Sequence, residues 1–136
     1  MLDCDLVINV PIVKHHVLAN LTMCMKNYMG VIESRKFFHQ NLPVCVTDIT
    51  RFLKPRISIL DAVRVLTAHG PSGGNLADVR LLSTVAAGVD IVALDAFGAE
   101  LMGKEPKSIG SIALGEKAGL GKIDYRSLAL KELKVS

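Results

Sequence analysis

Short, nearly continuous apolar segments alternate along the chain with segments that have helical spacing or helix-boundary residues. The segments of strand length are residues 5–11, 56–60 and 81–87, and the helical segments are residues 18–29, 43–53, 90–102 and 107–118. Uninterrupted runs of Val, Ile and Leu are typical of strands buried on both faces, and their alternation with helices favours a parallel or mixed sheet. The pattern predicts a three-layer α/β fold, with a mostly parallel or mixed sheet and flanking helices.

Residues with known boundary preferences delimit the predicted helices. Asn41 can cap a helix that Pro43 opens, and Asp90 can cap the next one. Gly103 and Gly119 follow the last two helical segments, at the place where glycine commonly ends a helix. From residue 125 onward, alternating leucines permit a final strand.

The chain has 136 residues, of which 50% are hydrophobic and only 4% aromatic. This length suits one domain, so we expect residues 1–136 to form a single α/β domain with an aliphatic core. Its apolar stretches are interrupted before the roughly 18 to 20 residues that a bilayer crossing needs, and its acidic N-terminus is unlike a secretory signal. We therefore expect a cytoplasmic protein without a membrane span.

Three widely spaced cysteines, Cys4, Cys24 and Cys45, form no CxxC pair. An odd number without that spacing indicates neither a disulfide framework nor an iron-sulfur cluster motif. Free cysteines of this kind are commonly buried thiols in a reducing compartment. The sequence therefore identifies no cofactor.

The net charge of +3 comes from scattered Lys and Arg residues with few aromatic residues among them. Nucleic-acid binding proteins usually carry a dense basic patch, so this class is not expected. Part of the positive charge lies near Lys14, Lys26, Arg35 and Lys36. That distribution suits a small anionic ligand better than a polymer.

Polar residues follow the first two predicted strands. Lys14, His15 and His16 come after the first strand, and Asp61 stands directly after the second. Ligands of open α/β sheets bind at the carboxyl ends of the strands, so these side chains are expected at one edge.

Further candidates lie on the first predicted helix and in two connections. Lys26 and Asn27 belong to the helix, and His39 belongs to a polar connection. Residues 67–75 form a loop rich in glycine, in which backbone N–H groups can be aimed at an anion. Its candidate residues are Gly70, Ser72, Gly73 and Gly74. The loop lacks both the Walker A sequence and GxGxxG, and a plain structural turn is the competing interpretation.

These residues are assigned to binding or to catalysis by their chemistry. The predicted ligand-binding residues are Lys14, His15, Lys26, Asn27, Gly70, Ser72, Gly73, Gly74 and Asp95. The predicted acid-base groups or metal ligands are His16, His39 and Asp61. For each histidine a scaffolding hydrogen bond is the competing interpretation. No HxxxH or CxxC spacing identifies a metal.

Taken in order, a set of motifs resembles the domain-of-unknown-function 362 family. The motifs are Ile8-Asn9-Val10-Pro11, Lys14-His15-His16, Leu21-Thr22, Met25-Lys26-Asn27-Tyr28-Met29-Gly30, His39-Gln40-Asn41, Ile59-Leu60-Asp61, Gly70-Pro71-Ser72-Gly73-Gly74 and residues 90–96. The resemblance extends to about Gly121 and is to the later half of a family domain. It implies that the chain is a partial version of a larger domain.

Members of that family often carry a ferredoxin-like module with cluster-binding cysteines, which have no counterpart here. The resemblance carries over the polar pattern, with Lys-Thr-His in the family where this chain has Lys14-His15-His16. His16 is therefore the matching histidine.

Two functions from different classes follow as expectations, and neither decides whether the chain is an enzyme. The first is a small-anion site for phosphate or carboxylate at strand ends, with a redox association implied by the family. The second is a non-catalytic module that docks a ferredoxin-like or other redox partner, or completes a larger assembly. A metalloprotein that uses His and Cys is a third, weaker alternative.

Overall fold

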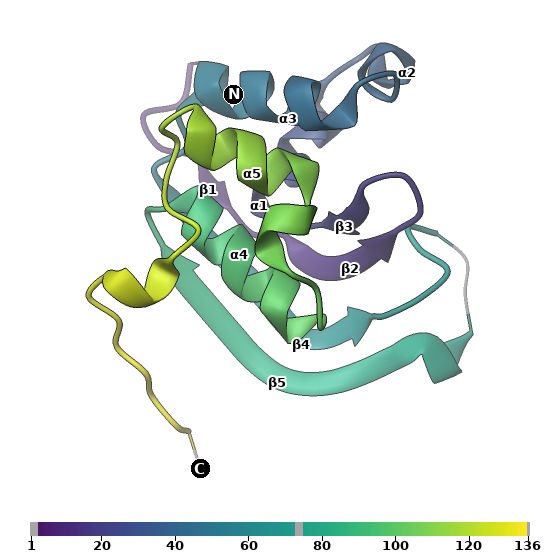
Figure 1. The fold of residues 1–136 in the computed structure, drawn as a ribbon, viewed down its shortest axis with the longest axis vertical. Helices are drawn as coiled ribbons and strands as arrows, with labels where there is room; N and C mark the ends of the chain where they lie inside the picture. Colours follow the sequence, from purple (N-terminus) through teal and green to yellow (C-terminus); the bar gives the residue numbers. More distant parts are fainter. Residues whose placement is uncertain (1–2, 73–74, 136) are drawn as a thin grey trace.

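The computed structural model describes residues 3–72 and 75–135 and contains a five-stranded sheet with helices packed against it (Figure 1). The strands are β1 (Ile8–Asn9), β2 (Ile12–His16), β3 (Asn20–Thr22), β4 (Ile57–Leu66) and β5 (Val79–Gly88). The helices are α1 (Cys24–Asn27), α2 (Arg35–Phe38), α3 (Leu42–Leu53), α4 (Ile91–Leu101) and α5 (Gly110–Lys117). Short 3-10 helices occupy Tyr28–Val31, Leu76–Asp78, Pro106–Ser108 and Tyr125–Ser127.

Strand β4 is the centre of the sheet. β1 and β2 run parallel to one edge of β4, with Ile8 opposite Ile57 and Ile12 opposite Asp61. β5 runs antiparallel along the other edge of β4, and β3 runs antiparallel to β2. β1 and β2 are thus two parts of one line of chain, which continues past Pro11 because the Pro11 carbonyl accepts a 2.9 Å hydrogen bond from the Asp61 N–H. The sheet is mixed, as predicted.

The helices form two further layers. α1 and α4 pack against the strands, whereas α3 and α5 pack against each other and against α1 and α4. In Figure 1, α4, α5 and α3 follow one another away from β5. The predicted three-layer α/β fold is confirmed, with the layers being the sheet, α1 with α4, and α3 with α5. Within residues 3–72 and 75–135, none of the helices combines the length and apolar character that a membrane crossing requires.

Aliphatic side chains and methionines fill the space between β4 and α4. Leu60 and Ala62 are fully buried on the helix side of β4, whereas Asp61 between them is only half-buried. α4 lies close to the sheet at Gly98, where an added Cβ would come within 2.6 Å of the Met23 Sδ and 3.1 Å of the Leu60 Cδ2. A glycine is therefore required at the closest approach of helix and sheet.

A buried carboxylate joins α4 to the start of α1. Asp95 is 2% exposed, and it accepts hydrogen bonds from the backbone N–H groups of Cys24 (2.6 Å) and Met25 (3.1 Å). The first N–H groups of a helix have no partner within the helix, so Asp95 caps α1 from a helix that lies about 70 residues further along the chain. Burial raises the pKa of Asp95 to about 7, although the two N–H donors oppose this shift.

Most predicted boundaries agree with the structure. α3 has Pro43 in its first turn, and α4 begins after Asp90, whose carboxylate accepts a 2.8 Å hydrogen bond from the Ala93 N–H. Gly103 and Gly119 both adopt positive φ, which glycine favours. Strand β4 extends beyond its predicted segment at the C-terminal end, and β5 extends beyond its predicted segment at both ends.

Two predictions are wrong, and the final strand that the sequence permitted does not form in the described part of the tail. Residues 18–29 form β3, α1 and part of a 3-10 helix instead of one helix, because the β2–β3 hairpin places Leu21 in the sheet. Lys14, His15 and His16 lie within β2 rather than after a strand. The tail after residue 125 forms a 3-10 turn at Tyr125–Ser127 and then has no regular structure up to residue 135.

Replacing Asp95 tests whether its carboxyl group titrates inside the core. A carboxyl group whose pKa is raised on folding stabilises the folded state at low pH, and this contribution is lost as pH rises through the folded pKa. The free energy of unfolding of the natural chain, relative to Asp95→Asn, should therefore fall between about pH 4 and pH 7 by at most about 1.4 kcal/mol per pH unit. Above pH 7 the difference should become constant.

Urea unfolding followed by circular dichroism from pH 4.5 to pH 8.5 measures this difference. Asp95→Ala, which leaves two buried N–H groups without an acceptor, should lose about 2 to 5 kcal/mol. A pH-independent difference between the natural chain and Asp95→Asn would show that Asp95 remains ionised throughout.

Candidate functional site

His16 lies at the centre of a group of basic side chains. It ends β2 with 5% of its surface exposed, and its Nδ1 accepts hydrogen bonds from the backbone N–H groups of Leu18 (3.1 Å) and Ala19 (3.2 Å). Burial, the largest cause, and nearby positive charges lower the pKa of His16 to about 4. The basic neighbours are Lys26, His39, Lys14 and His15. The ring is therefore neutral at pH 7, carries its proton on Nε2 and holds the β2–β3 turn in place.

Lys26 lies on α1, half-buried next to this group. Burial lowers the pKa of Lys26, and the positive charge of Lys14 lowers it further. The two ion pairs formed within the described residues involve neither lysine, so in that part of the chain no carboxylate lies within 4.0 Å of either amino group. Burial of a cation is costly unless an anion compensates its charge. The positive charges of Lys14 and Lys26 are thus not compensated by a nearby carboxylate in the described part of the chain.

A small hollow of about 50 Å³ opens beside Lys26. The turn between β2 and β3 and the first turns of α3 and α5 form its walls. The lining residues are Leu18, Ala19, Asn20, Lys26, Leu42, Pro43, Val46, Gly110 and Ser111. The lining therefore combines apolar side chains with the polar side chains of Lys26, Asn20 and Ser111.

Two helices begin at this hollow. The residues that precede them, Asn41 before α3 and Ile109 before α5, make no side-chain capping hydrogen bond, and neither first turn contains an acidic residue. The two starts are in contact, because an added Cβ on Gly110 would lie 2.8 Å from the Pro43 Cγ. Unpaired N–H groups and the helix dipole make such ends favourable for negative charge.

The hollow thus combines several groups that favour an oxyanion. Lys26 supplies a positive charge, Ser111 can supply a hydroxyl, and the first turns of α3 and α5 can supply backbone N–H groups. Each of these groups recognises phosphate or carboxylate oxygens in proteins. The arrangement suits a small anion bound at the junction of two helix starts.

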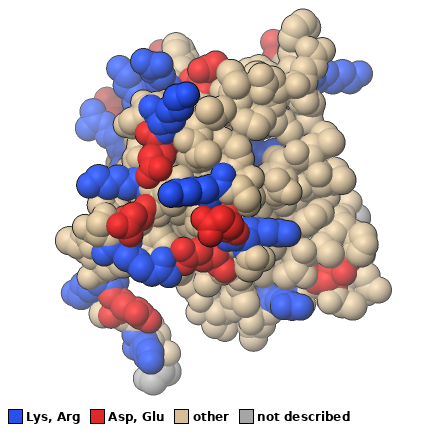
Figure 2. All heavy atoms as spheres, in the orientation of Figure 1, with Lys and Arg blue, Asp and Glu red and all other residues tan. Residues whose placement is uncertain are grey.

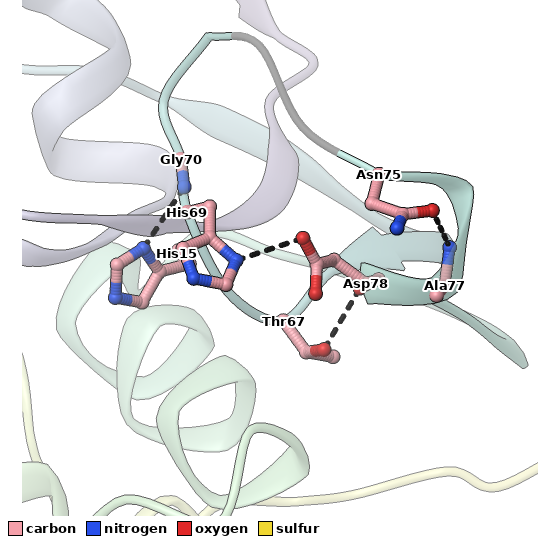
Figure 3. A network of polar contacts seen from close by, with 7 residues as sticks. All are labelled: His15, Thr67, His69, Gly70, Asn75, Ala77 and Asp78. Carbon is pink, nitrogen blue, oxygen red and sulfur yellow. Dashed lines mark hydrogen bonds and ion pairs between the residues drawn. The ribbon is translucent and has the colours of Figure 1, made fainter.

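The glycine-rich loop reaches the same end of β2. Gly70 donates its N–H to the Nδ1 of His15 (3.1 Å) and accepts a hydrogen bond from the Val17 N–H (3.3 Å), as Figure 3 shows for His15. A Cβ at Gly70 would overlap the His15 carbonyl group, so the loop and β2 are in direct backbone contact. His15 therefore anchors the loop as a hydrogen-bond acceptor.

The rest of this loop is organised by short-range contacts. His69 forms a 2.9 Å ion pair with Asp78, whose pKa is lowered by this hydrogen bond, and Thr67 Oγ1 donates to the Asp78 carbonyl (Figure 3). Ser72 is exposed. The predicted binding residues Gly73 and Gly74 lie outside the described residues.

Three predicted site residues lie apart from the hollow. Asn27 donates to the Oδ1 of Asn9 (2.8 Å), and Asp95 caps α1 from inside the core. Asp61 does not follow a strand but lies in the middle of β4, where its carboxylate accepts a 2.9 Å hydrogen bond from the Val63 N–H. The predicted strand-end position of Asp61 is wrong, because β4 continues for five residues beyond it.

His39 belongs to the basic group but is more exposed than His16. It follows α2, and its Nδ1 contacts the Arg35 carbonyl at 2.7 Å. Because a carbonyl only accepts, this contact requires a proton on Nδ1.

The sequence did not identify Asn20, Gly110 and Ser111 as lining residues. Pro43 was visible as a helix-opening residue, and the missing acidic residues in both first turns could have been noted. That the two helix starts meet depends on tertiary packing.

Among the described residues, no three or more His, Cys, Asp and Glu side chains are grouped closely enough to hold a metal ion. The cysteines differ in environment, since Cys24 is buried, Cys45 is partly buried and Cys4 is exposed. The expectation of three buried thiols therefore holds for Cys24 alone.

Comparison with known proteins gives a family but no activity. A family model described as "Domain of unknown function (DUF362)" matches residues 1–100. A thylakoid-associated protein of Synechocystis sp. is 29% identical over 128 residues, covering 88% of this chain and 39% of that protein. The chain thus spans well under half the length of this relative. No solved structure matches this chain. Because the family model covers most of the chain, the protein belongs to the DUF362 family.

Proposed function

We propose that the protein binds a small anion, a phosphate or carboxylate group, in the hollow between the β2–β3 turn and the first turns of α3 and α5. The observation that carries this proposal is the contact between two uncapped helix starts beside the half-buried Lys26. Lys14 adds charge from β2.

In this proposal each group has a separate task. Lys26 provides the direct ionic contact, and the N–H groups of the helix starts and the Ser111 hydroxyl orient the oxygen atoms. Lys14 strengthens the local positive potential, since its charge already acts on Lys26. His16 acts as a positioning residue, because its Nδ1 is used by the turn that carries Leu18 and Ala19 into the wall of the hollow.

The surface charge supports a small ligand rather than a polymer. Figure 2 shows that positive and negative side chains are interspersed on the left part of the face seen in that view, while the right part carries few charges. A polyanion is bound through many phosphate contacts along a continuous basic field, whereas one anionic group needs only a local concentration of charge. The proposal is therefore restricted to a ligand whose anionic group fits the hollow.

A second proposal is that the chain acts as a non-catalytic module that completes a larger assembly. It is supported by an apolar face of the sheet that no described helix covers. Binding of a small anion and docking through the sheet use different faces of the molecule, so the two proposals are independent.

Removing the charge of Lys26 tests the anion site. Lys26→Met keeps most of the side-chain length, and its affinity for inorganic phosphate should fall at least 10-fold because a hydrogen bond to a charged group contributes about 1.5 to 3 kcal/mol. Lys14→Met should have a smaller effect. Isothermal titration calorimetry at low ionic strength measures both affinities.

Lys117→Met is the matched control, because Lys117 lies in the last turn of α5, at the opposite end from the hollow. It should bind phosphate as the natural chain does. If Lys26→Met bound phosphate and small carboxylates such as acetate or succinate with unchanged affinity, the proposed site would be wrong.

A second variant tests the role of the two helix starts without changing any charge. Gly110→Ala adds a Cβ that meets Pro43 at 2.8 to 3.0 Å, so the first turns of α3 and α5 must move apart. Phosphate affinity should fall several-fold, while circular dichroism should show a folded chain. Gly30→Ala is the control, since an added Cβ there meets nothing within 4 Å. Equal affinities for the two variants would contradict a binding role for the helix junction.

A further inference from the structure

The face of the sheet that points away from α1 and α4 carries exposed aliphatic side chains. Along the line of β1 and β2, every second residue from Leu6 to Ile12 is more than half exposed. These residues are Leu6 (53%), Ile8 (53%), Val10 (57%) and Ile12 (52%). On β5, Leu81 (69%) and Val85 (59%) are exposed in the same way. We call this surface the open face.

Strand register shows that these side chains form one surface. Ile12 and Val85 both lie opposite Asp61 of β4, on its two edges. Asp61 lies between Leu60 and Ala62, which are fully buried on the helix side, so Asp61 and its neighbours in register point to the other side. The open face therefore extends across three adjacent lines of strand.

The area of the open face is in the range of apolar patches that mark interaction sites. Three strands spaced about 4.8 Å apart, each about ten residues long at about 3.3 Å per residue, cover roughly 500 Å² in plan. Apolar patches of this size on monomers commonly mark an interaction site, and stable interfaces bury about 800 Å² of accessible surface per partner. Side chains that project from the sheet present more accessible surface than the plan area.

Two opposite charges lie in the middle of the open face. Asp61 and Arg64 both belong to β4, and neither takes part in an ion pair within the described residues. A carboxylate placed in a dry interface requires a partner of opposite charge. Among the described residues of one copy, the carboxylate of Asp61 accepts a hydrogen bond only from the N–H of Val63.

A second copy of the chain can supply that partner. A two-fold axis can lie midway between two facing sheets and pass over β4 near Val63. This axis runs the two β4 strands antiparallel and brings Asp61 of each copy opposite Arg64 of the other. Such an isologous contact pairs both charges twice and packs the aliphatic side chains of the two copies against each other at the usual spacing of about 10 Å.

We propose that the open face packs against the same face of a second copy, forming a two-sheet dimer whose central contacts are reciprocal Asp61–Arg64 ion pairs. The anion site lies on the other side of the sheet, among the helices, and is left accessible by this contact. The dimer does not depend on ligand binding.

Sedimentation equilibrium of the natural chain tests the proposal. At a chain concentration of about 100 µM, well above a dissociation constant of about 1 µM, the mass should be twice the 14.7 kDa of one chain. Val85→Lys places a charge in the centre of the open face and should give a monomer. Phe52→Lys is the control, because Phe52 is 69% exposed but lies on α3, so this variant should remain a dimer.

Charge reversal then tests the geometry of the contact. Asp61→Arg should weaken the dimer at least 10-fold, because it places like charges opposite each other, and adding Arg64→Asp should restore it. Circular dichroism establishes that each variant is folded. A natural chain that stays monomeric would show that this face does not bind a second copy, and a dimeric Val85→Lys would show that the copies meet elsewhere. Failure of the double variant to restore a dimer that Asp61→Arg had broken would overturn the reciprocal ion pairs.

Discussion

The placement of α1 depends on one buried carboxylate. α1 has only four residues and cannot be stable as an isolated helix, so its position must come from tertiary contacts. Asp95 supplies them by accepting the N–H groups of Cys24 and Met25. Because Lys26 follows directly on the same turn, a side chain in the core of α4 determines where the central cation of the candidate site lies.

A second polar contact completes this support from the sheet. Asn9 of β1 donates to the Cys24 carbonyl (2.9 Å) and to Ser58 of β4 (3.3 Å), and its Oδ1 accepts the amide of Asn27. The start of α1 is therefore held by α4 and by the sheet, and its end is held by the sheet. Asn27 and Asp95 were predicted as ligand-binding residues, but in the structure their polar groups hold α1 in place.

The asymmetry of the fold has functional consequences. Both helical layers lie on one side of the sheet, so one side contains the helix starts and the lysines, while the other presents aliphatic side chains around Asp61 and Arg64. A sheet needs an apolar surface against each of its apolar faces. The two proposed functions, anion binding and self-association, follow from the two sides of this single arrangement.

Local sequence determined the elements that are set by short-range preferences. Pro43, Asp90 and Gly103 marked helix boundaries correctly, and runs of Val, Ile and Leu located β4 and β5, because capping, backbone freedom and burial act within a few residues. The sequence also singled out Lys14, His16 and Lys26 as candidate site residues. Tertiary structure alone decided that residues 20–22 join a sheet, that Asp61 lies within a strand and that two helix starts meet at Gly110. Those outcomes depend on contacts between residues far apart in the chain, whose energies exceed the weak local preferences that a sequence pattern expresses.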